Sequence, residues 1–186
     1  MKFPTLKTER LLLREVSNND EKDMIENLSN LKVTKWLLVV PYPYTKKDAR
    51  WWIKHSKEKY KDKKRNSYEF AIALKEGNKY IGGIGLTKID LVQETGSLGY
   101  WLGEKYWRKG YGSEALDAVL KFAFNELKLR RLEAGVVVGN PSSGKLLEKF
   151  GAKLEGMKRK GIRCKSDNKI KDENIYGLLK EEWKRL

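Results

Sequence analysis

A basic, glycine-spaced loop in front of a helix is the first feature of this chain that could do chemistry. Residues 108–112 read Arg-Lys-Gly-Tyr-Gly, and an apolar stripe typical of a helix begins around Ser113. The first N–H groups of a helix have no partner inside the helix, and glycines let them face a ligand without obstruction. This arrangement suits a pyrophosphate, and an ordinary tight turn explains the same residues equally well.

Other familiar motifs of catalysis and nucleotide binding are absent from the sequence. The loop matches neither the nucleotide P-loop, GxxxxGK(S/T), nor the dinucleotide fingerprint GxGxxG after a strand. Cys164 is the single cysteine, which excludes an internal disulfide and any multi-cysteine metal site, so we expect no metal. The single histidine, His55, lies far from Cys164 in the sequence, which argues against Cys–His catalysis.

The charge balance favours an anionic partner. The chain has 40 Lys and Arg against 25 Asp and Glu, a net charge of +15, which attracts nucleotide cofactors, RNA, anionic surfaces or acidic proteins. The longest apolar run, residues 36–40, is too short to span a bilayer, and the N-terminus lacks a signal-peptide pattern, so we expect a cytoplasmic protein. Without repeats or linkers, the 186 residues are expected to form one domain, residues 1–186.

Hydrophobic periodicity and turn residues predict the elements that would position the loop. In chain order we expect a strand at 9–16, a helix capped by Ser17, a helix at 45–64, strands at 67–74, 79–90 and 95–103, a helix from 113 to 127, a strand at 130–138, a helix from Asn140 to Gly151, and strands at 152–160 and 170–180. This order predicts an α+β domain around a mixed, mostly antiparallel sheet.

Three segments together resemble a known family. They are GYWLGEKYWRKGYGSEA at 99–115, NPSSGKLLEKFGA at 140–152, and GMKRKGIR at 156–163 followed by IYGLLKEEW at 175–183. In this order they resemble the GNAT superfamily of acyl-CoA N-acyltransferases, and within it the ribosomal-protein-type (RimJ/RimL-like) branch. The resemblance runs from TERLLLREV at 8–16 almost to the C-terminus. It implies a sheet with helices on both faces that splays open to form a cofactor wedge.

The resemblance also implies how acetyl-CoA would be held. The family's loop, Gln/Arg-x-x-Gly-x-Gly/Ala, binds the pyrophosphate of coenzyme A with backbone amides; Gly110 and Gly112 match it, whereas Trp107 departs from its first position. The resemblance therefore favours a phosphate-binding loop over an ordinary tight turn. The cofactor-binding residues so implied are Tyr100, Trp101, Leu102, Trp107, Arg108, Lys109, Gly110, Tyr111, Gly112, Ser113, Asn140, Ser143 and Lys145.

By the same resemblance, an amine would attack the thioester directly, without an acyl-enzyme. A backbone N–H near Tyr100 or Trp101 would stabilise the oxyanion, and Ser143 would protonate the leaving thiolate. Asn140 would touch the cofactor, and helix capping alone also explains it. The general base is open: relatives carry an acid where this chain has Ser97. The candidates that could act through water are the carboxylates of Glu94 and Glu133, and both could equally be solvated surface groups.

Aromatic residues are the candidates for the acceptor side, because they can surround an amine or stack on a peptide. They are Trp36, Tyr42, Tyr44, Trp51 and Tyr176. Aromatics are also ordinary core material, and burial in the core is the favoured interpretation of Trp51 and Trp52.

We therefore expect an acetyl-CoA-dependent N-acetyltransferase, a monomer or homodimer, that acts on a protein or peptide amine such as an N-terminus. The net charge argues against polyamines and aminoglycosides unless a local acidic pocket exists. A small-molecule amine remains a variant of this hypothesis. The alternative is a basic RNA- or ribosome-binding module on the same scaffold without catalysis, suggested by the basic clusters at 54–65 and 157–165.

Overall fold

One sheet of eight strands organises the chain. The computed structural model describes residues 3–61 and 65–185, and the strands lie in the order β1-β2-β3-β4-β5-β6-β8-β7. Neighbouring strands are antiparallel except for β5 and β6. The strands are β1 (Leu6–Lys7), β2 (Leu11–Arg14), β3 (Tyr68–Leu74), β4 (Tyr80–Asp90), β5 (Thr95–Leu102), β6 (Arg131–Val137), β7 (Lys153–Arg163) and β8 (Ile170–Leu179).

The helices confirm the predicted order and add elements that the pattern did not predict. They are η1 (Asn18–Asp20), α1 (Glu21–Leu28), α2 (Leu31–Thr34), α3 (Lys46–Lys61), η2 (Glu104–Tyr106), α4 (Tyr111–Lys121), the π-helical turn η3 (Phe122–Glu126), α5 (Pro141–Lys149) and η4 (Lys180–Glu182). Strand β1 and helix α2 were not expected, since neither is long enough to show a period. The predicted end of the helix at 62–64 lies outside the described residues.

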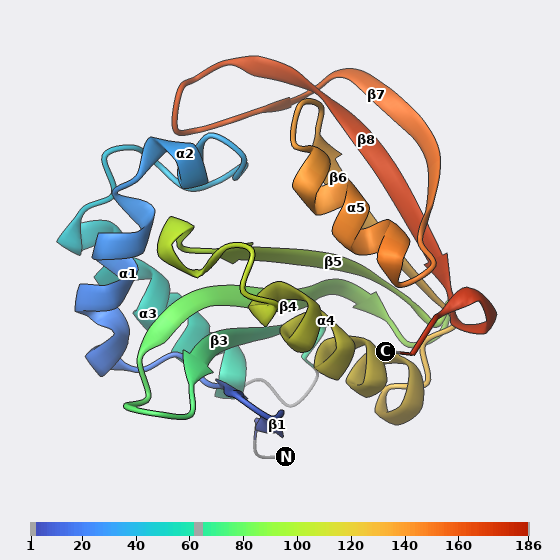
Figure 1. Cartoon of the computed structure of the whole chain (residues 1–186), viewed down its shortest axis with the longest axis horizontal. Helices are drawn as coiled ribbons and strands as arrows, with labels where there is room; N and C mark the ends of the chain where they lie inside the picture. Colours follow the sequence, from blue (N-terminus) through green and yellow to red (C-terminus); the bar gives the residue numbers. More distant parts are fainter. Residues whose placement is uncertain (1–2, 62–64, 186) are drawn as a thin grey trace.

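The helices cover both faces of the sheet, as the α+β prediction requires. Helices α4 and α5 pack against one face with side chains such as Leu116, Leu120 and Leu147. Helices α1 and α3 cover the other face with Met24 and Ile53. Figure 1 shows α4 and α5 in front of the sheet and α3 behind it. The sheet therefore has a face toward α4 and α5 and an opposite face toward α1 and α3.

The last two strands form a long hairpin that arches over the opposite face. Strand β7 is exposed along almost its whole length. The hairpin tip returns to the chain near α2, where Lys165 N donates to Leu38 O at 2.9 Å and Ser166 Oγ donates to Thr34 O at 3.0 Å. Figure 1 shows this arch reaching from the far edge of the sheet to α2. The two strands were predicted from sequence, but their arch was not.

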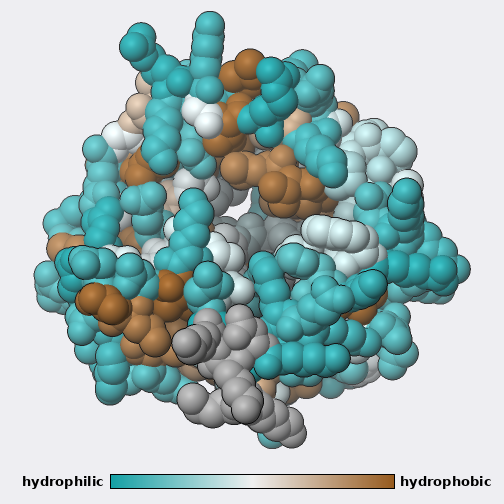
Figure 2. Space-filling view, turned by 180° about the vertical axis from the view of Figure 1, so that it is seen from behind, coloured by the Kyte–Doolittle hydropathy of each residue, from teal (hydrophilic) through white to brown (hydrophobic). Residues whose placement is uncertain are grey.

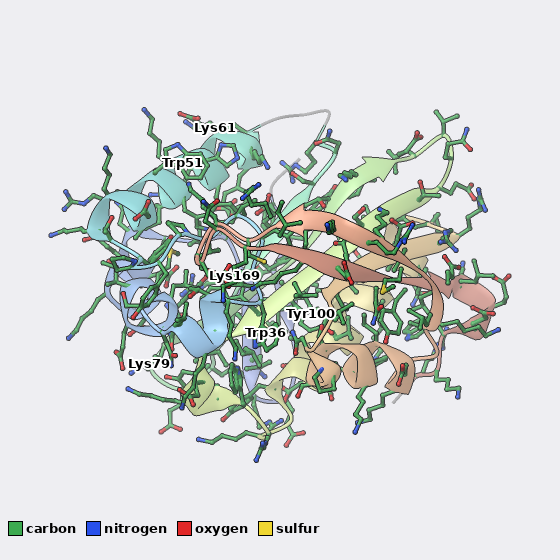
Figure 3. All side chains as sticks on the ribbon, turned by 90° about the horizontal axis from the view of Figure 1, so that it is seen from above. Trp36, Trp51, Lys61, Lys79, Tyr100 and Lys169 are labelled. Carbon is green, nitrogen blue, oxygen red and sulfur yellow. The ribbon has the colours of Figure 1, made fainter. Side chains whose placement is uncertain are left out.

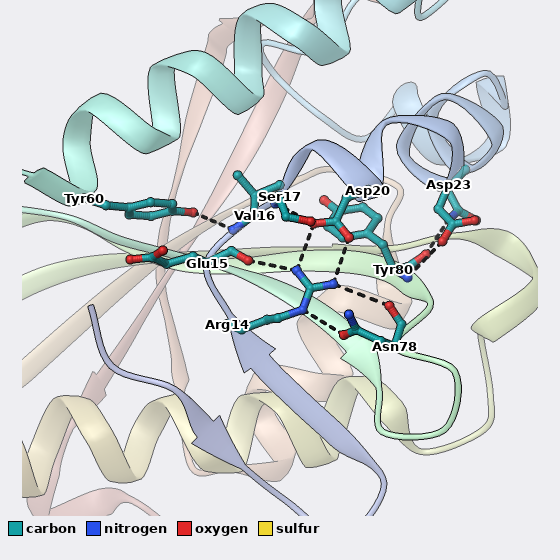
Figure 4. Close-up of polar contacts among 10 residues, drawn as sticks. Arg14, Glu15, Val16, Ser17, Asp20, Asp23, Tyr60, Asn78 and Tyr80 are labelled. Carbon is teal, nitrogen blue, oxygen red and sulfur yellow. Dashed lines mark hydrogen bonds and ion pairs between the residues drawn. The ribbon is translucent and has the colours of Figure 1, made fainter. Parts of the chain in front are cut away.

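A buried ion pair fixes the start of α1 to the sheet. Arg14 at the end of β2 donates from both terminal nitrogens to Asp20, at 2.8 and 2.9 Å, and from Nε to Asn78 at 2.9 Å (Figure 4). One turn later, Asp23 accepts the backbone N–H of Tyr80 at 3.0 Å. These contacts position α1, and through it the short helix α2, relative to the middle of the sheet.

Candidate active site

Strands β5 and β6 diverge and leave a wedge in the middle of the sheet. They pair only where Thr95, Gly96 and Ser97 face residues 131–133. Beyond that point β5 continues along β4 to Leu102, while β6 continues along β8 to Val137. Figure 2 shows an opening between the side chains in the middle of the opposite face, where Figure 1 separates these strands.

The backbone of β5 offers hydrogen-bonding groups to this wedge. In an antiparallel pair, hydrogen-bonded residues alternate along a strand. Gly103 N donates to Ile81 O at 2.9 Å, so two residues earlier Trp101 also bonds with β4, opposite Gly83. The N–H and C=O groups of Tyr100 therefore point into the wedge. The expectation that Trp101 could supply the oxyanion donor is wrong, because its N–H points to β4.

The end of β5 is tied to the glycine loop by Trp107. Its indole nitrogen donates to the carbonyl of Leu102 at 2.7 Å. This bond occupies the Leu102 carbonyl and leaves the N–H of the same residue directed into the wedge. Trp107, which stands where the family has Gln or Arg, thus has a structural role of its own: it connects the glycine loop to the end of β5.

The loop before α4 presents free backbone amides, as its sequence suggested. Gly110 has a left-handed backbone, with φ at 83°, and the helix begins at Tyr111. The first intrahelical bond runs from Glu114 N to Gly110 O at 3.0 Å. The three N–H groups before it, of Tyr111, Gly112 and Ser113, have no helical acceptor. A Cβ at Gly112 would lie 3.6 Å from Leu102 Cδ1, so these amides lie beside the end of β5.

A polar clamp that the sequence did not reveal holds this loop. Arg10 on the turn before β2 donates to Lys109 O at 3.0 Å and, from Nε, to Glu114 at 2.7 Å. Thr8 Oγ1 also donates to Glu114, at 2.6 Å. Burial alone would raise the pKa of Glu114, and the hydrogen bonds from Thr8 and Arg10 outweigh it and lower that pKa. The loop is therefore held by a carboxylate that remains charged.

Tyr100 and Ser143 meet across the wedge. Tyr100 Oη donates to the carbonyl of Ser143 at 2.9 Å, and Ser143 Oγ donates to Tyr100 Oη at 3.0 Å. Burial raises the pKa of Tyr100 to about 12, although the bond from Ser143 lowers it. The pair is therefore protonated at every physiological pH and contains two hydroxyl protons beside the start of α5.

Two further predicted residues lie on α5 at this point. Asn140 stands at the N-cap position, but its side chain makes no capping hydrogen bond. The alternative explanation of Asn140, that its side chain caps the helix, is therefore wrong. Lys145 lies on the exposed side of α5, where it could meet phosphate groups without competing with an ion pair in the described part of the chain.

The two predicted carboxylates lie at different distances from the wedge. Glu94 precedes β5, and its carbonyl accepts the N–H of Arg130 at 2.8 Å. It is six residues before Tyr100, so at about 3.3 Å per residue it lies roughly 20 Å away, at the other end of the strand. Glu133 stands opposite Ser97, where the strands begin to diverge, and its carboxylate lies 3.7 Å from Arg131. The structure brings Glu133 to the wedge and leaves Glu94 outside it.

A third carboxylate, Glu173 on β8, was not predicted. A methyl group at Gly135 on β6 would collide with its Oε1, so this carboxylate lies directly on the β6 backbone. Strand pairing places Glu173 opposite Val137, which no pattern of residues 130–180 reveals.

Of the predicted aromatics, Trp36 lies beside the end of β6. Its ring would be 3.7 Å from a Cβ at Gly139, just after β6, and it packs against Val137 beneath the hairpin tip. Tyr42 is 44% exposed in the loop between α2 and α3.

The other three aromatics are placed differently. Tyr44 is buried between α1 and α3, with its hydroxyl 3.3 Å from Met24 Sδ, and Tyr176 is buried against α5 with its hydroxyl 3.3 Å from Glu148. Trp51 is 62% exposed on the outer side of α3, apart from Tyr100 in Figure 3. Burial of Trp51 in the core was therefore a wrong expectation, whereas its neighbour Trp52 does pack against the core.

The single cysteine and the single histidine lie in different surroundings. Cys164 is fully buried beneath the hairpin tip, whereas His55 stacks on Trp51, with ring centroids 4.9 Å apart. Within residues 3–61 and 65–185, no three His, Cys, Asp or Glu side chains are grouped in a way that could hold a metal ion. No helix among these residues is long and apolar enough to cross a membrane.

A mostly antiparallel sheet that splays between two parallel strands, with an amide-rich loop beside the splay, defines the GNAT fold. Residues 10–153 match the family model described as an acetyltransferase (GNAT) domain. The chain therefore belongs to the GNAT acetyltransferase family.

Individual relatives agree with this assignment. "Uncharacterized N-acetyltransferase p20" of Bacillus licheniformis is 32% identical over 96% of this chain and 98% of its own length. A crystal structure of a GNAT-family acetyltransferase from Bacillus anthracis is 32% identical, with a TM-score of 0.79, over 96% of this chain and 100% of that one. "Putative ribosomal N-acetyltransferase YdaF" of Bacillus subtilis is 33% identical over 55% of each chain. The chain is accordingly an acetyltransferase.

Proposed function

We propose that residues 1–186 act as one domain that transfers an acetyl group from acetyl-CoA to the amine of a peptide or protein N-terminus. The observation that carries this proposal is the position of the free amides of α4 beside the unpaired backbone of β5. A pyrophosphate on the amides of residues 111–113 would direct a pantetheine arm along Tyr100 and Leu102. Arg108, Lys109 and Lys145 would add positive charge near the phosphates.

The chemistry follows from the groups around the wedge. The N–H of Tyr100 would stabilise the oxyanion that forms when an amine attacks the thioester carbonyl. The leaving thiolate requires a proton, and Ser143 with Tyr100 supplies a pair of hydroxyls at the start of α5. Acetyl-CoA is the donor substrate in this scheme, and no metal takes part in it.

A chain end is the acceptor that fits the opposite face best. The hairpin tip bonds to residues 34–38, on both sides of Trp36 in the sequence. In this proposal the tip restricts access, so that an N-terminus enters more easily than a folded surface. The name of one Bacillus subtilis relative, "Putative ribosomal N-acetyltransferase YdaF", supports a ribosomal protein as one source of such a terminus. The net charge of +15 disfavours polycationic amines.

The direct test is an acetyl-transfer assay read by mass spectrometry. Purified protein is incubated with acetyl-CoA and peptides that begin with Ser, Ala, Thr or Met. The same peptides with a blocked N-terminus and one internal lysine, and spermidine, serve as competing acceptors. Transfer to free N-termini is expected; transfer to spermidine alone would contradict the peptide acceptor, and no transfer at all would contradict the proposed activity.

The proton donor gives a first quantitative prediction. Ser143→Ala is expected to lower kcat by about 10²-fold, the usual size of a general-acid contribution, because the thiolate would then leave unprotonated. The affinity for acetyl-CoA should change little, since backbone amides carry most of the binding. Ser142→Ala, an exposed neighbour on α5, is the matched control, and equal kcat values for the two variants would exclude Ser143 as donor.

A second candidate function, RNA binding, has a specific observation in its favour on α3. The exposed Trp51 ring is parallel to His55, at an angle of 9°. Lys47 and Lys54, four residues before and three after Trp51, flank it on the same face of the helix. Stacked rings between cations suit the unpaired bases of RNA.

RNA binding is testable apart from catalysis. Trp51→Ala is expected to weaken binding of a labelled single-stranded oligouridylate by about 1–3 kcal/mol, the contribution of one stacked base. Fluorescence anisotropy at two salt concentrations measures it, since phosphate contacts also make the affinity fall with salt. Val92→Ala, an exposed apolar residue in the β4–β5 turn, should have no effect, and equal affinities for both variants would reject this surface.

A further inference from the structure

We propose that Glu173 is the general base that removes a proton from the acceptor amine. This inference rests on the proposed function and supplies the group that the sequence left open. Glu94 lies at the wrong end of β5, and Glu133 is already within 3.7 Å of a guanidinium. Four observations on Glu173 carry the argument: its contact with β6, the face on which it lies, the open space beside it, and its lack of a partner.

A glycine of β6 allows the Glu173 side chain, which comes from β8, to lie against the β6 backbone. A methyl group at Gly135 would overlap Glu173 Oε1 and lie 2.7 Å from its Cδ. Any larger residue at position 135 would therefore displace the carboxylate from the backbone of β6. The side chain reaches back from its own register position, opposite Val137, toward the point where the wedge opens.

The face on which it lies is the acceptor side. Leu132, Ala134 and Val136 point into the core beneath α4 and α5, so alternation directs Gly135 to the opposite face of β6. Coenzyme A would approach from the face of α4, where the amide loop lies. A carboxylate on the other face meets the acceptor and not the phosphates, which it would repel.

The space beside the carboxylate is open. Ser97 and Glu133 are the last paired residues of β5 and β6, and Gly99 and Gly135 are each two residues beyond them. A Cβ at Gly99 would meet nothing within 4 Å. The gap at this level is therefore bounded by Glu173 on one side and by the strand that carries the Tyr100 N–H on the other, which is where an amine must stand to attack.

The carboxylate is also unpartnered. Among residues 3–61 and 65–185, no hydrogen bond or ion pair to Glu173 is found, although it is half-buried in a chain with 40 Lys and Arg. Its nearest basic neighbour along β8, Lys171, is bound to Asp167 at 2.9 Å and to Lys35 O at 2.8 Å. Lys158 stands opposite it on β7 without an ion pair to it. The oxygens of Glu173 are thus not engaged by the basic groups around them.

A second carboxylate in the same hairpin, Glu155, lies over a glycine but is held by an arginine. Glu155 on β7 lies over Gly177 of β8 in the same manner. It receives two hydrogen bonds from Arg131, at 2.7 and 2.5 Å, which lower its pKa. Glu173 has the same arrangement over a glycine and no arginine, so its oxygens remain available to a ligand.

The proton balance is simple. The acceptor enters as an ammonium and passes one proton to Glu173; its nitrogen lone pair then forms the C–N bond while the C–S bond breaks. The Ser143–Tyr100 hydroxyls pass a proton to the departing thiolate, which ends as a thiol. The second amine proton leaves the nitrogen as the amide forms and replaces, through water, the proton that these hydroxyls gave up. Glu173 then releases its proton to solvent.

The test uses Glu173→Gln, with Glu76→Gln, an exposed carboxylate in the β3–β4 turn, as its matched control. Transfer to the peptide panel is measured at about pH 6.5 and about pH 9.5, on either side of the ordinary pKa of an α-amine, about 7.7–8.0. We expect Glu173→Gln to lower kcat/KM by about 10²-fold or more at the lower pH. The loss should be much smaller at the higher pH, where the amine is already neutral.

Two further measurements separate the outcomes. The affinity for acetyl-CoA by calorimetry and the Tm should match those of wild type, because Glu173 lies off the cofactor face and has no partner to lose. Active wild type with an equally active Glu173→Gln, or a loss that is the same at both pH values, would overturn the base but leave the transferase intact. Wild type that acetylates no acceptor would overturn both.

Discussion

Gly110→Glu is expected to abolish the detectable binding of acetyl-CoA in calorimetry. Position 110 has φ at 83°, a conformation that costs a residue with a side chain roughly 1–2 kcal/mol. A Cβ at this position would lie 3.1 Å from Arg10 Nη2, so the new side chain would also crowd the arginine that holds the loop. Its carboxylate would bring negative charge next to the free amides of Tyr111, Gly112 and Ser113 and repel a pyrophosphate. With the loop displaced and the charge repelling, we expect a loss of about 3 kcal/mol in binding free energy, which corresponds to a weakening above 10²-fold.

Gly77→Glu is the matched control for this change. Gly77 also has a left-handed backbone, with φ at 67°, and a Cβ there would meet nothing within 4 Å. It lies in the β3–β4 turn, so the variant has the same charge and a similar strain outside the site. Equal affinities for the two variants would contradict a phosphate site on the α4 loop, and a wild type that binds no acetyl-CoA would contradict the proposed donor.

Local features of this fold could be predicted from the sequence because they depend on neighbours in the chain. The meander of β3, β4 and β5 follows from a period of two and from turn residues between the strands. The amides before α4 follow from Gly110 and Gly112 next to an apolar stripe. Both are properties of short segments. The resemblance to GNAT enzymes added the pyrophosphate that we propose the amides bind.

The parts that were missed depend on contacts between distant segments. Arg10 and Lys109 are about a hundred residues apart, and Glu173 meets Gly135 only because β8 inserts between β6 and β7. No spacing in the sequence records such a pairing. The prediction that Trp51 is buried was wrong for another reason. Of two adjacent aromatic residues on an amphipathic helix, either one can face the core, and the packing of the neighbouring turns decides which.

Asp20→Asn is expected to give the largest loss of stability, about 3–5 kcal/mol in the free energy of unfolding, which is the cost of removing one partner of a buried ion pair. The side chains of Arg14 and Asp20 are only 13% and 3% exposed. The amide that replaces the carboxylate would keep its shape but leave the guanidinium with an uncompensated charge away from water. Asp20 also accepts the N–H of Ser17 at 2.7 Å, so the start of η1 is weakened as well.

Glu21→Gln tests whether burial is the cause. Glu21 is the next residue and forms an ion pair with Arg50 at 2.8 Å, but the Arg50 side chain is 64% exposed, and an exposed pair contributes little. Urea unfolding should show a large fall in midpoint for Asp20→Asn, an unchanged slope, and almost no change for Glu21→Gln. Similar midpoints would mean that water screens the Arg14 pair. A selective loss would mean that this pair holds α1 against the sheet.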